Sequence, residues 1–296
     1  MAAAAYRSGE RLVNEYDGMA HDYTRKGGIV HSEILLPPHA PPELADRSTL
    51  WNSVERIEKH RRAQLAREIE VALPAELDRD TQLKLVRDYC QKTFVNTGMC
   101  ADICIHDKGD GNPHAHILLT MRPLNLDGTW GDKQKKEYVL DAHGQKIYDP
   151  KKRQYKCNSV PTTDWNEQTK AEEWRQFWAE FTNRAFADNQ IAQAIDHRSY
   201  ARQGVSKLPT IHLGVAASQM ERRGVPTEKD AINHLIANDN QLILELKQKI
   251  AALTKWLRLE QEPPASIRKR LAHYNAQLKQ AEAAKEYRSK RRDLER

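Results

Sequence analysis

Three histidines stand close together in the segment His106-Asp-Lys-Gly-Asp-Gly-Asn-Pro-His114-Ala-His116. Imidazole nitrogens are common ligands of divalent metal ions, and three of them leave a coordination position open for a substrate oxygen. A single histidine on a strand is usually an ordinary polar surface residue. Three at this spacing are much rarer by chance, and they predict a metal site.

Two predicted strands bring these histidines together. Residues 99–106 and 114–122 are rich in aliphatic side chains, and the residues between them have the composition of a tight turn. Because side chains alternate along a strand, His114 and His116 point to the same face. His106 ends the neighbouring strand of the same antiparallel hairpin and returns beside them. The site alone does not name the reaction, since metal-dependent hydrolases also use histidine triads.

A third predicted strand carries acidic residues. Residues 67–73 alternate polar and apolar side chains, the period of a half-buried strand, so Glu68 and Glu70 share one face. Histidines that bind a metal usually donate their second ring N–H to an acceptor that fixes the tautomer. The candidates for that acceptor are Glu70, Asp102 and Asp107.

The wider pattern predicts an α+β fold, with an antiparallel sheet and helices on one of its faces. Residues 28–37 form a further strand that ends at two prolines. Asp78 or Asp80 caps a helix that reaches Phe94. Further helices are expected at residues 50–65 and 167–189, and a polar loop region with a small hairpin at residues 123–165.

The C-terminal part of the chain has a different character. Beyond residue 226, Leu and Ile recur at heptad-like spacing among charged residues, and Pro263 and Pro264 interrupt the pattern. We therefore divide the chain into a domain at residues 1–225 and a basic, coiled-coil-like helical tail at residues 226–296.

The composition is that of a polar chain with one core. The 296 residues are 39% hydrophobic and 30% charged, and no apolar run is long enough to insert into and span a bilayer. No signal peptide is recognisable at the N-terminus. The four cysteines form no Cys-x-x-Cys pair, which is typical of reduced thiols in a cytoplasmic protein. The net charge of +6 favours a polyanionic partner, a signal that many basic proteins share without binding nucleic acid.

Several segments together resemble one protein family. AAAAYRSGERL, EILLP, AREIEVALP and GMCADICIHDKGDGNPHAHILLTMRPL are similar to the MobA/MobL family of plasmid relaxases, which are tyrosine nucleases of the histidine-hydrophobe-histidine (HUH) type. The resemblance runs from about residue 5 to residue 225, and HRSYARQGVSKLPTIHLG also fits it. The motif NPHAHILLTMR is the most specific part.

The resemblance implies a role for individual residues. His106, His114 and His116 match the metal ligands, and Glu68 matches an acidic position at the metal site. Tyr6 matches the nucleophile. The implied cofactor is a divalent metal ion, with manganese or magnesium the first candidates. The implied reaction nicks one DNA strand, leaves the enzyme attached to the 5′ phosphate, and allows the strand to be rejoined.

This chemistry is physically consistent. A free tyrosine has a pKa near about 10 and is a weak nucleophile at neutral pH. A metal-bound phosphate is a better target, because the cation stabilises the charge that builds in the transition state. A tyrosyl-phosphate stores the cleaved bond as a covalent intermediate.

The resemblance also implies partners. The substrate is single-stranded DNA at a plasmid transfer origin, and accessory relaxosome proteins and a type IV coupling protein are expected as protein partners. Thr120 and Arg122 follow the histidine pair at period two, so they share its face and are candidate contacts of the DNA phosphates, with a plain surface role as the alternative. Arg198, in a linker at residues 196–213, is a third candidate.

Two other functions fit part of the pattern. HUH replication initiators place their tyrosine on a downstream helix in a Tyr-x-x-Lys pattern, and Tyr148-Asp-Pro-Lys151 has that spacing. Pro150 is unfavourable inside a helix, which argues against this assignment. A non-catalytic DNA-binding accessory protein would have the basic charge but would not need three converging histidines.

One departure from the family concerns the N-terminus. Members usually begin with a strand some twenty residues before the tyrosine, whereas Met1 stands five residues before Tyr6. We therefore expect the strand of His114 and His116 to have an unpaired edge, the chain to be an N-terminally shortened version, and Ile117 and Leu119 to lose cover.

Overall fold

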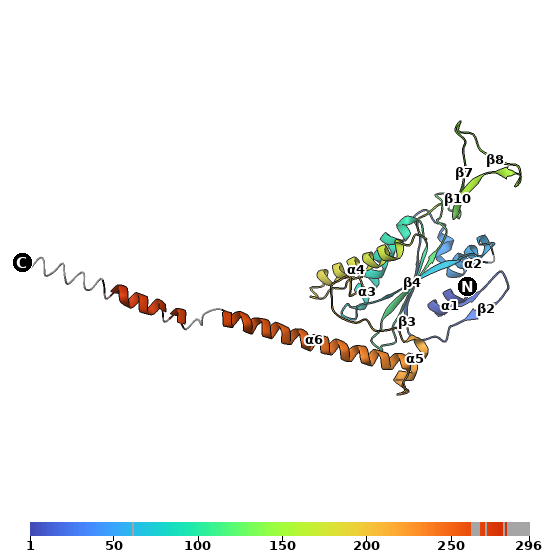
Figure 1. Cartoon of the computed structure of the whole chain (residues 1–296). Coiled ribbons are helices and arrows are strands. Elements are labelled where there is room, and N and C mark those ends of the chain that lie inside the picture. Colours follow the sequence, from blue (N-terminus) through green and yellow to red (C-terminus); the bar gives the residue numbers. More distant parts are fainter. Residues whose placement is uncertain (61, 262–266, 270, 281, 283–296) are drawn as a thin grey trace, which may run out of the picture. The chain divides into compact units, whose positions relative to one another are not determined.

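The computed structural model describes residues 1–296 except 61, 262–266, 270, 281 and 283–296 (Figure 1). The chain forms two units, Met1–His197 and Arg198–Arg296. The first unit contains the sheet and His106, His114 and His116. The boundary between the units falls at residue 197, earlier than residue 225, where the change in sequence character lies.

A four-stranded antiparallel sheet forms the centre of the first unit. The strand order is β3-β5-β6-β4, and each strand lies where alternation or aliphatic content predicted one. The hairpin of β5 and β6 pairs His106 with His114. The strands are β3 (Ile29–Leu35), β4 (Ala66–Ala72), β5 (Ala101–His106) and β6 (His114–Thr120).

The histidine strand β6 is paired on both sides. It bonds to β5 from His114 to Leu119 and to β4 from His114 to Thr120. The expectation of an unpaired edge on this strand is therefore wrong, because β4 and β5 enclose it. Ile117 and Leu119 are also fully buried. The strands at the two ends of the sheet are β3 and β4.

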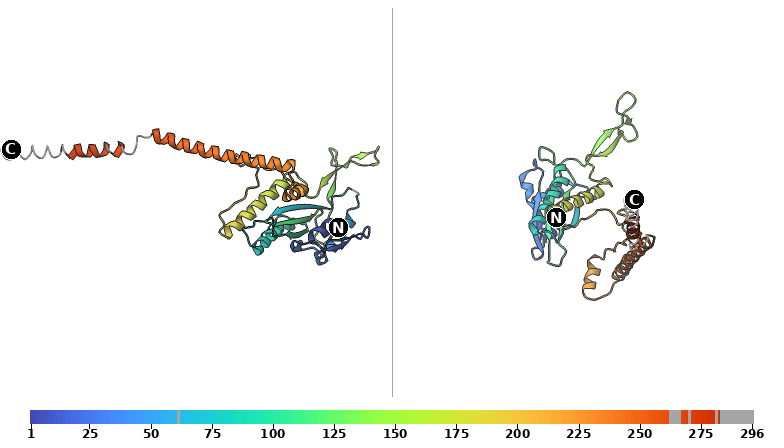
Figure 2. Two further views of the ribbon diagram at one scale, coloured as in Figure 1. Left: turned by 90° about the horizontal axis from the view of Figure 1, so that it is seen from below. Right: turned by 90° about the vertical axis from the view of Figure 1, so that its left-hand side faces the viewer.

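Two long helices cover one face of the sheet. Asp78 caps the first by accepting a hydrogen bond from the backbone N–H of Thr81, as its sequence predicts. Aromatic side chains of both helices pack with Ile103, Ile105 and Ile117 of the sheet. Figures 1 and 2 show the helices side by side on this face. They are α3 (Arg79–Thr93) and α4 (Lys170–Asp188).

The sequence predicted helices on one face of the sheet, but helices also pack on the opposite face. Ala4 and Ala5 of α1 and Leu50, Trp51 and Val54 of α2 form a second apolar cluster there. The alternate residues of β5 are consequently buried as well, so that this strand is covered on both sides. The short elements of this layer are α1 (Ala2–Ser8), β1 (Arg11–Val13), β2 (Ala20–Asp22), the 3-10 helix at Pro42–Ala45 and α2 (Arg47–Ile57).

The polar region between β6 and α4, where a small hairpin was predicted, forms an exposed arm with antiparallel strand pairs. Two antiparallel pairs, β7 with β10 and β8 with β9, project from the first unit (Figure 1). The strands are β7 (Gln134–Tyr138), β8 (Tyr148–Asp149), β9 (Gln154–Tyr155) and β10 (Cys157–Pro161), and a 3-10 helix at Val95–Thr97 follows α3.

The second unit is helical. Asn233 and Asn240 of its long helix each exchange two hydrogen bonds with the backbone of the preceding segment, at Ile211 and Leu208. Among the described residues, none of the helices combines the length and apolar content needed to cross a membrane. The helices are α5 (Gly214–Arg222) and α6 (Glu228–Gln261).

Candidate active site

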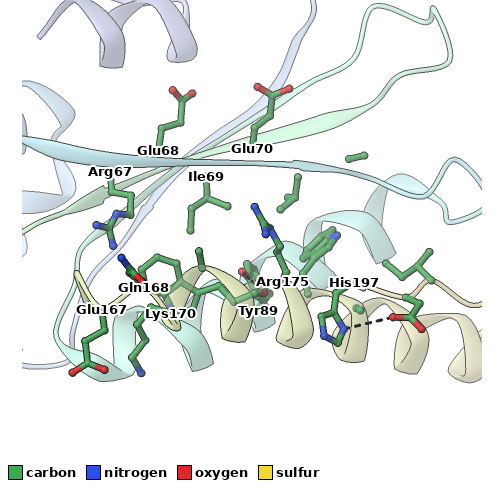
Figure 3. Close-up of a pocket in the computed structure, with 18 residues that line it drawn as sticks. Arg67, Glu68, Ile69, Glu70, Tyr89, Glu167, Gln168, Lys170, Arg175 and His197 are labelled. Carbon is green, nitrogen blue, oxygen red and sulfur yellow. Dashed lines mark hydrogen bonds and ion pairs between the residues drawn. The ribbon is translucent and has the colours of Figure 1, made fainter. Parts of the chain in front are cut away.

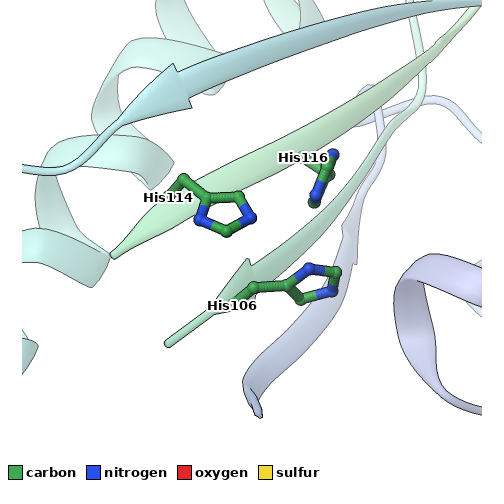
Figure 4. Close-up of side chains that lie close together, drawn as sticks. All are labelled: His106, His114 and His116. Carbon is green, nitrogen blue, oxygen red and sulfur yellow. The ribbon is translucent and has the colours of Figure 1, made fainter. Parts of the chain in front are cut away.

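The three histidines converge on one face of the β5–β6 hairpin (Figure 4). The ring centroids of His106 and His116 are 4.6 Å apart, those of His114 and His116 5.0 Å, and those of His106 and His114 5.5 Å. One nitrogen from each ring lies within 4.8 Å of the others. This arrangement suits a divalent cation held by three imidazoles.

Each histidine also has one ring nitrogen engaged by an acceptor. Nε2 of His106 donates to the carbonyl oxygen of Arg7 at 2.6 Å, and Nδ1 of His114 donates to that of Asn112 at 2.8 Å. Nδ1 of His116 lies 2.9 Å from Oε1 of Glu68. Donation fixes the proton on that nitrogen, so the other nitrogen of each ring keeps its lone pair. The residues present therefore fit a resident metal ion.

Burial favours the neutral, ligating form of two of these rings. It lowers the pKa of His106 to about 4, and nearby Lys26 adds to the effect while the hydrogen bond to Arg7 opposes it. Burial also lowers the pKa of His116, against the opposing influence of Glu68 and Glu70. A neutral imidazole is the state that binds a metal.

Glu68 lies against His116 and is not one of the three side chains whose nitrogens converge as a candidate metal site. Its carboxylate accepts from Nδ1 of His116 and, through both oxygens, from the guanidinium of Arg7. Burial raises its pKa, but the hydrogen bonds and charge of Arg7 outweigh this and lower the pKa overall. Glu70, the rival on the same face, is 3.8 Å from the same nitrogen. Glu68 thus occupies the acceptor position that was expected for Glu70, Asp102 or Asp107.

Tyr6 lies on α1 beside the triad, half exposed. Gly9 ends this helix with a φ of 69°, and a Cβ there would clash with Ile29 at 2.3 Å, so α1 sits close against β3. Lys26 joins the tyrosine to the histidines. Its Nζ is 3.7 Å from the centre of the Tyr6 ring and 3.5 Å from Nε2 of His106.

Lys26 and Arg7 were not found from the sequence. Lys26 also donates to the carbonyl oxygen of Tyr6 at 2.7 Å, and Arg7 contacts both His106 and Glu68. Both residues reach the site through contacts with residues distant in sequence, and neither belongs to a periodic sequence pattern. The only sequence signal for Arg7 is its place directly after Tyr6.

Asp102 belongs to a buried network beside the site. Its carboxylate accepts from Nε and Nη2 of Arg47 at 2.9–3.1 Å and from Nε1 of Trp51 at 2.8 Å. Asp102 is 2% exposed, so these donors replace water entirely. The network binds α2 to β5 and does not reach the histidine rings.

The predicted DNA contacts fall in different places. Thr120 is fully buried, and its hydroxyl accepts the N–H of Cys100, so it is a structural residue of the sheet and the expectation of a phosphate contact is corrected. Arg122 donates to Glu58 at 2.8 Å and to the carbonyl oxygen of Gly131 at 3.0 Å. Arg198 opens the second unit, and its role stays a prediction.

Tyr148, the alternative nucleophile, lies on β8 of the exposed arm. Its ring packs edge-on against Tyr155 at 5.4 Å. It therefore sits on a strand and not on the helix that the initiator pattern requires. Asp107, the remaining acceptor candidate, pairs with Arg79 and the backbone of Gly109.

A cleft of about 710 Å³ lies between β4 and α4, away from the triad. Figure 3 shows Glu68 and Glu70 pointing to one side of β4, and Arg67 and Ile69 to the other side, toward α4. The histidine site is on the Glu68 side. The cleft thus lies under the opposite face of the sheet, and it contains none of the three histidines.

Comparison with known sequences places the chain in a family. The MobA/MobL family profile matches residues 1–223, and the chain belongs to this family. It is 35% identical to "Probable mobilization protein MobA" of Bifidobacterium longum, over 85% of this chain and 47% of that protein. It is 34% identical to "Mobilization protein MobL" of Acidithiobacillus ferridurans, over 83% of this chain and 68% of that protein.

The chain also resembles part of a longer protein and one solved structure. It is 38% identical to "Conjugal transfer protein TraA" of Rhizobium radiobacter, over 78% of this chain but only 21% of that protein. It shares a fold, with a TM-score of 0.57 and 30% identity, with a structure described as "Molecular Basis of Vancomycin Resistance Transfer in Staphylococcus aureus". That match covers 67% of this chain and 90% of the other. Among the relatives named first, the chain thus spans about half of one and about a fifth of another.

Proposed function

We propose that this chain is a mobilisation relaxase that nicks one strand of DNA at a plasmid transfer origin. Membership of the MobA/MobL family and the names of its relatives support a role in plasmid mobilisation or conjugal transfer. The single observation that carries the proposal is the link between the tyrosine helix and the histidine cluster. Residue 7, next to Tyr6, contacts His106 through its carbonyl and Glu68 through its guanidinium.

In this proposal the three histidines hold a divalent metal ion, which would neutralise the scissile phosphate. The hydroxyl of Tyr6 attacks the phosphorus, the bond from phosphorus to the 3′ oxygen breaks, and the phenol proton ends, overall, on that departing oxygen. The products are a 5′-phosphotyrosyl link and a free 3′ hydroxyl. The reverse attack rejoins the strand, because the covalent link stores the bond.

The other groups of the site have supporting roles in the same proposal. The ammonium of Lys26, in contact with the Tyr6 ring and with His106, supplies positive charge where tyrosine and phosphate meet. Glu68 holds the His116 tautomer, and Arg7 holds Glu68. Both are therefore positioning residues.

Strand-specific nicking of a supercoiled plasmid that carries the cognate origin tests the proposal. We expect relaxed plasmid and a protein–DNA adduct that survives denaturing electrophoresis, with both lost in the presence of a metal chelator. A plasmid without the origin is the control. Binding of the origin strand without any cleavage would favour the accessory DNA-binding protein instead.

A further inference from the structure

The long helix α6 carries an apolar seam with a seven-residue period. Ile236, Ile243, Ile250 and Leu257 recur at intervals of seven residues, and Leu246 and Leu253 follow Ile243 and Ile250 by three. In heptad terms, Ile or Leu occupies these a positions, Leu246 and Leu253 occupy the two d positions between them, and Glu260 stands at the next d position. Asp239 stands at the preceding d position and marks the N-terminal limit of the continuous seam.

Most of this seam is open to solvent. Leu246, Ile250, Leu253 and Leu257 are 48%, 62%, 58% and 50% exposed. Ile236 and Ile243 are less exposed, near the segment that Asn233 and Asn240 bind. An isolated helix gains little stability in water, and a helix of 34 residues normally depends on the packing of its apolar face. The open seam therefore requires a partner surface.

The residues at the two seam positions indicate which partner fits. β-branched Ile at a with Leu at d favours a parallel, two-stranded coiled coil. We infer that α6 pairs in parallel and in register with α6 of a second copy of this chain. This inference does not depend on the proposed nicking activity.

The flanking charges agree with this pairing. In a parallel dimer each g position faces the next e position of the partner helix. Lys249, at g, then faces Thr254, and Lys247, at e, faces Leu242. Lysine does not face lysine across this stretch of the seam, so no like-charge repulsion opposes the dimer there.

The same phase continues beyond α6. Ile267 and Tyr274 fall on d positions of the same heptad, and Leu271 and Leu278 on a positions. These four side chains are between 46% and 63% exposed. The apolar residues on the two sides of Pro263 and Pro264 thus share one heptad count, although Glu260 at d and Pro264 at a separate them.

Sedimentation equilibrium of the full chain tests the inference. The wild type is expected at twice the chain mass of 34.1 kDa across the micromolar range. Leu253→Glu places a charge in the seam and should give a monomer. Leu244→Glu is the matched control, because Leu244 is 50% exposed, close to the 58% of Leu253, but lies at a b position off the seam, and it should remain dimeric.

A wild type that is monomeric across the whole concentration range overturns the inference. The seam would then pack against another part of the same chain. Equal loss of the dimer in Leu253→Glu and Leu244→Glu also overturns it, since the seam would then not be specific. Far-ultraviolet circular dichroism of both variants separates loss of pairing from direct disruption of the helix. If the substitution acts through pairing, the helical signal of Leu253→Glu should fall only in proportion to the fraction of monomer.

Disulfide trapping tests the orientation. Ile250→Cys, in a Cys157→Ser background that removes the exposed thiol, should form a covalent dimer on mild oxidation, because identical a positions face each other only in a parallel, in-register pair. Lys255→Cys, at an f position on the outer surface, should not. Cross-linking of Lys255→Cys but not of Ile250→Cys rejects the parallel register.

Discussion

Oε1 of Glu68 lies 2.9 Å from Nδ1 of His116, although Glu70, and not Glu68, is the residue directly opposite His116 in the β4–β6 pairing. The closer contact is therefore diagonal, from Glu68 to the second residue along the neighbouring strand. Diagonal contacts of this kind are within reach of long side chains on a twisted sheet. The alternation of residues 67–73 predicted a shared face for both glutamates but not which of them reaches the imidazole.

Glu68→Gln should weaken metal binding without abolishing it. The glutamine keeps the shape of the side chain but removes the charge that fixes the His116 tautomer, and loss of such an acceptor typically costs 10- to 100-fold in metal affinity. Titration calorimetry with manganese measures the change. Glu70→Gln is the control and should have a smaller effect, because Glu70 is 3.8 Å from the ring. A larger loss in Glu70→Gln would exchange the two roles.

His116→Ala should remove most of the metal affinity, because it leaves only two of three imidazole ligands. His114→Ala should have the same effect, and both substitutions should abolish cleavage, as a chelator is expected to do in the wild type. Calorimetry with manganese detects the loss without reference to activity. His21→Ala, on β2 outside the cluster, is the control. Equal affinities in the wild type and His116→Ala would reject the metal site.

Tyr6→Phe should abolish the covalent adduct while binding of single-stranded DNA is retained. Phenylalanine keeps the ring that contacts Lys26 and Tyr23 and removes only the attacking oxygen. Denaturing electrophoresis of labelled origin DNA detects the adduct, and fluorescence anisotropy detects binding. Tyr148→Phe should behave like the wild type. The opposite outcome, an adduct in Tyr6→Phe but none in Tyr148→Phe, would assign the reaction to the exposed arm and favour a replication initiator.

Asp102→Ala should destabilise the first unit by roughly 3–5 kcal/mol, since it leaves the buried guanidinium of Arg47 without its main partner. Urea denaturation measures the loss. Arg56→Ala is a matched control, because it breaks an ion pair with Glu15 that is largely exposed, and it should cost less than about 1 kcal/mol. Similar losses in both variants would mean that the Asp102 network contributes no more than a surface ion pair.

The central strands could be predicted because their signals are local. Alternation in β4, the turn between β5 and β6, and the Asp78 cap each depend on neighbours in sequence, and all appear where expected. The predicted helix at residues 50–65 is shorter in the structure and ends at Ile57. Glu58, which follows it, is held by Arg122 and Lys133 from distant segments. Such a tertiary contact leaves no periodic trace in the sequence.

The second helical layer could not be predicted for a similar reason. All six residues of β5 are buried, and Asp102 is one of them. In a sequence, an aspartate at such a position indicates a side chain that faces solvent. Its partners, Arg47 and Trp51, are about fifty residues away in sequence. The contacts of Arg7 and Lys26 with the histidines are likewise long-range, so the ligand types could be predicted but not the groups that position them.

Thiol reactivity should distinguish Cys157 from the other cysteines. Burial raises the pKa of Cys100 and of Cys104 to about 12, and burial raises that of Cys90 well above its usual value, so these thiols carry almost no thiolate at pH 8. Cys157 is exposed on the arm. Iodoacetamide at pH 8 should therefore label only Cys157 in the folded chain, and all four cysteines in urea, as mass spectrometry of peptides would detect. Cys157→Ser should leave the folded protein unlabelled.

Rapid labelling of Cys104 under native conditions would mean that β5 opens to solvent. His106 lies on the same strand, so the burial that lowers its pKa would then be lost as well.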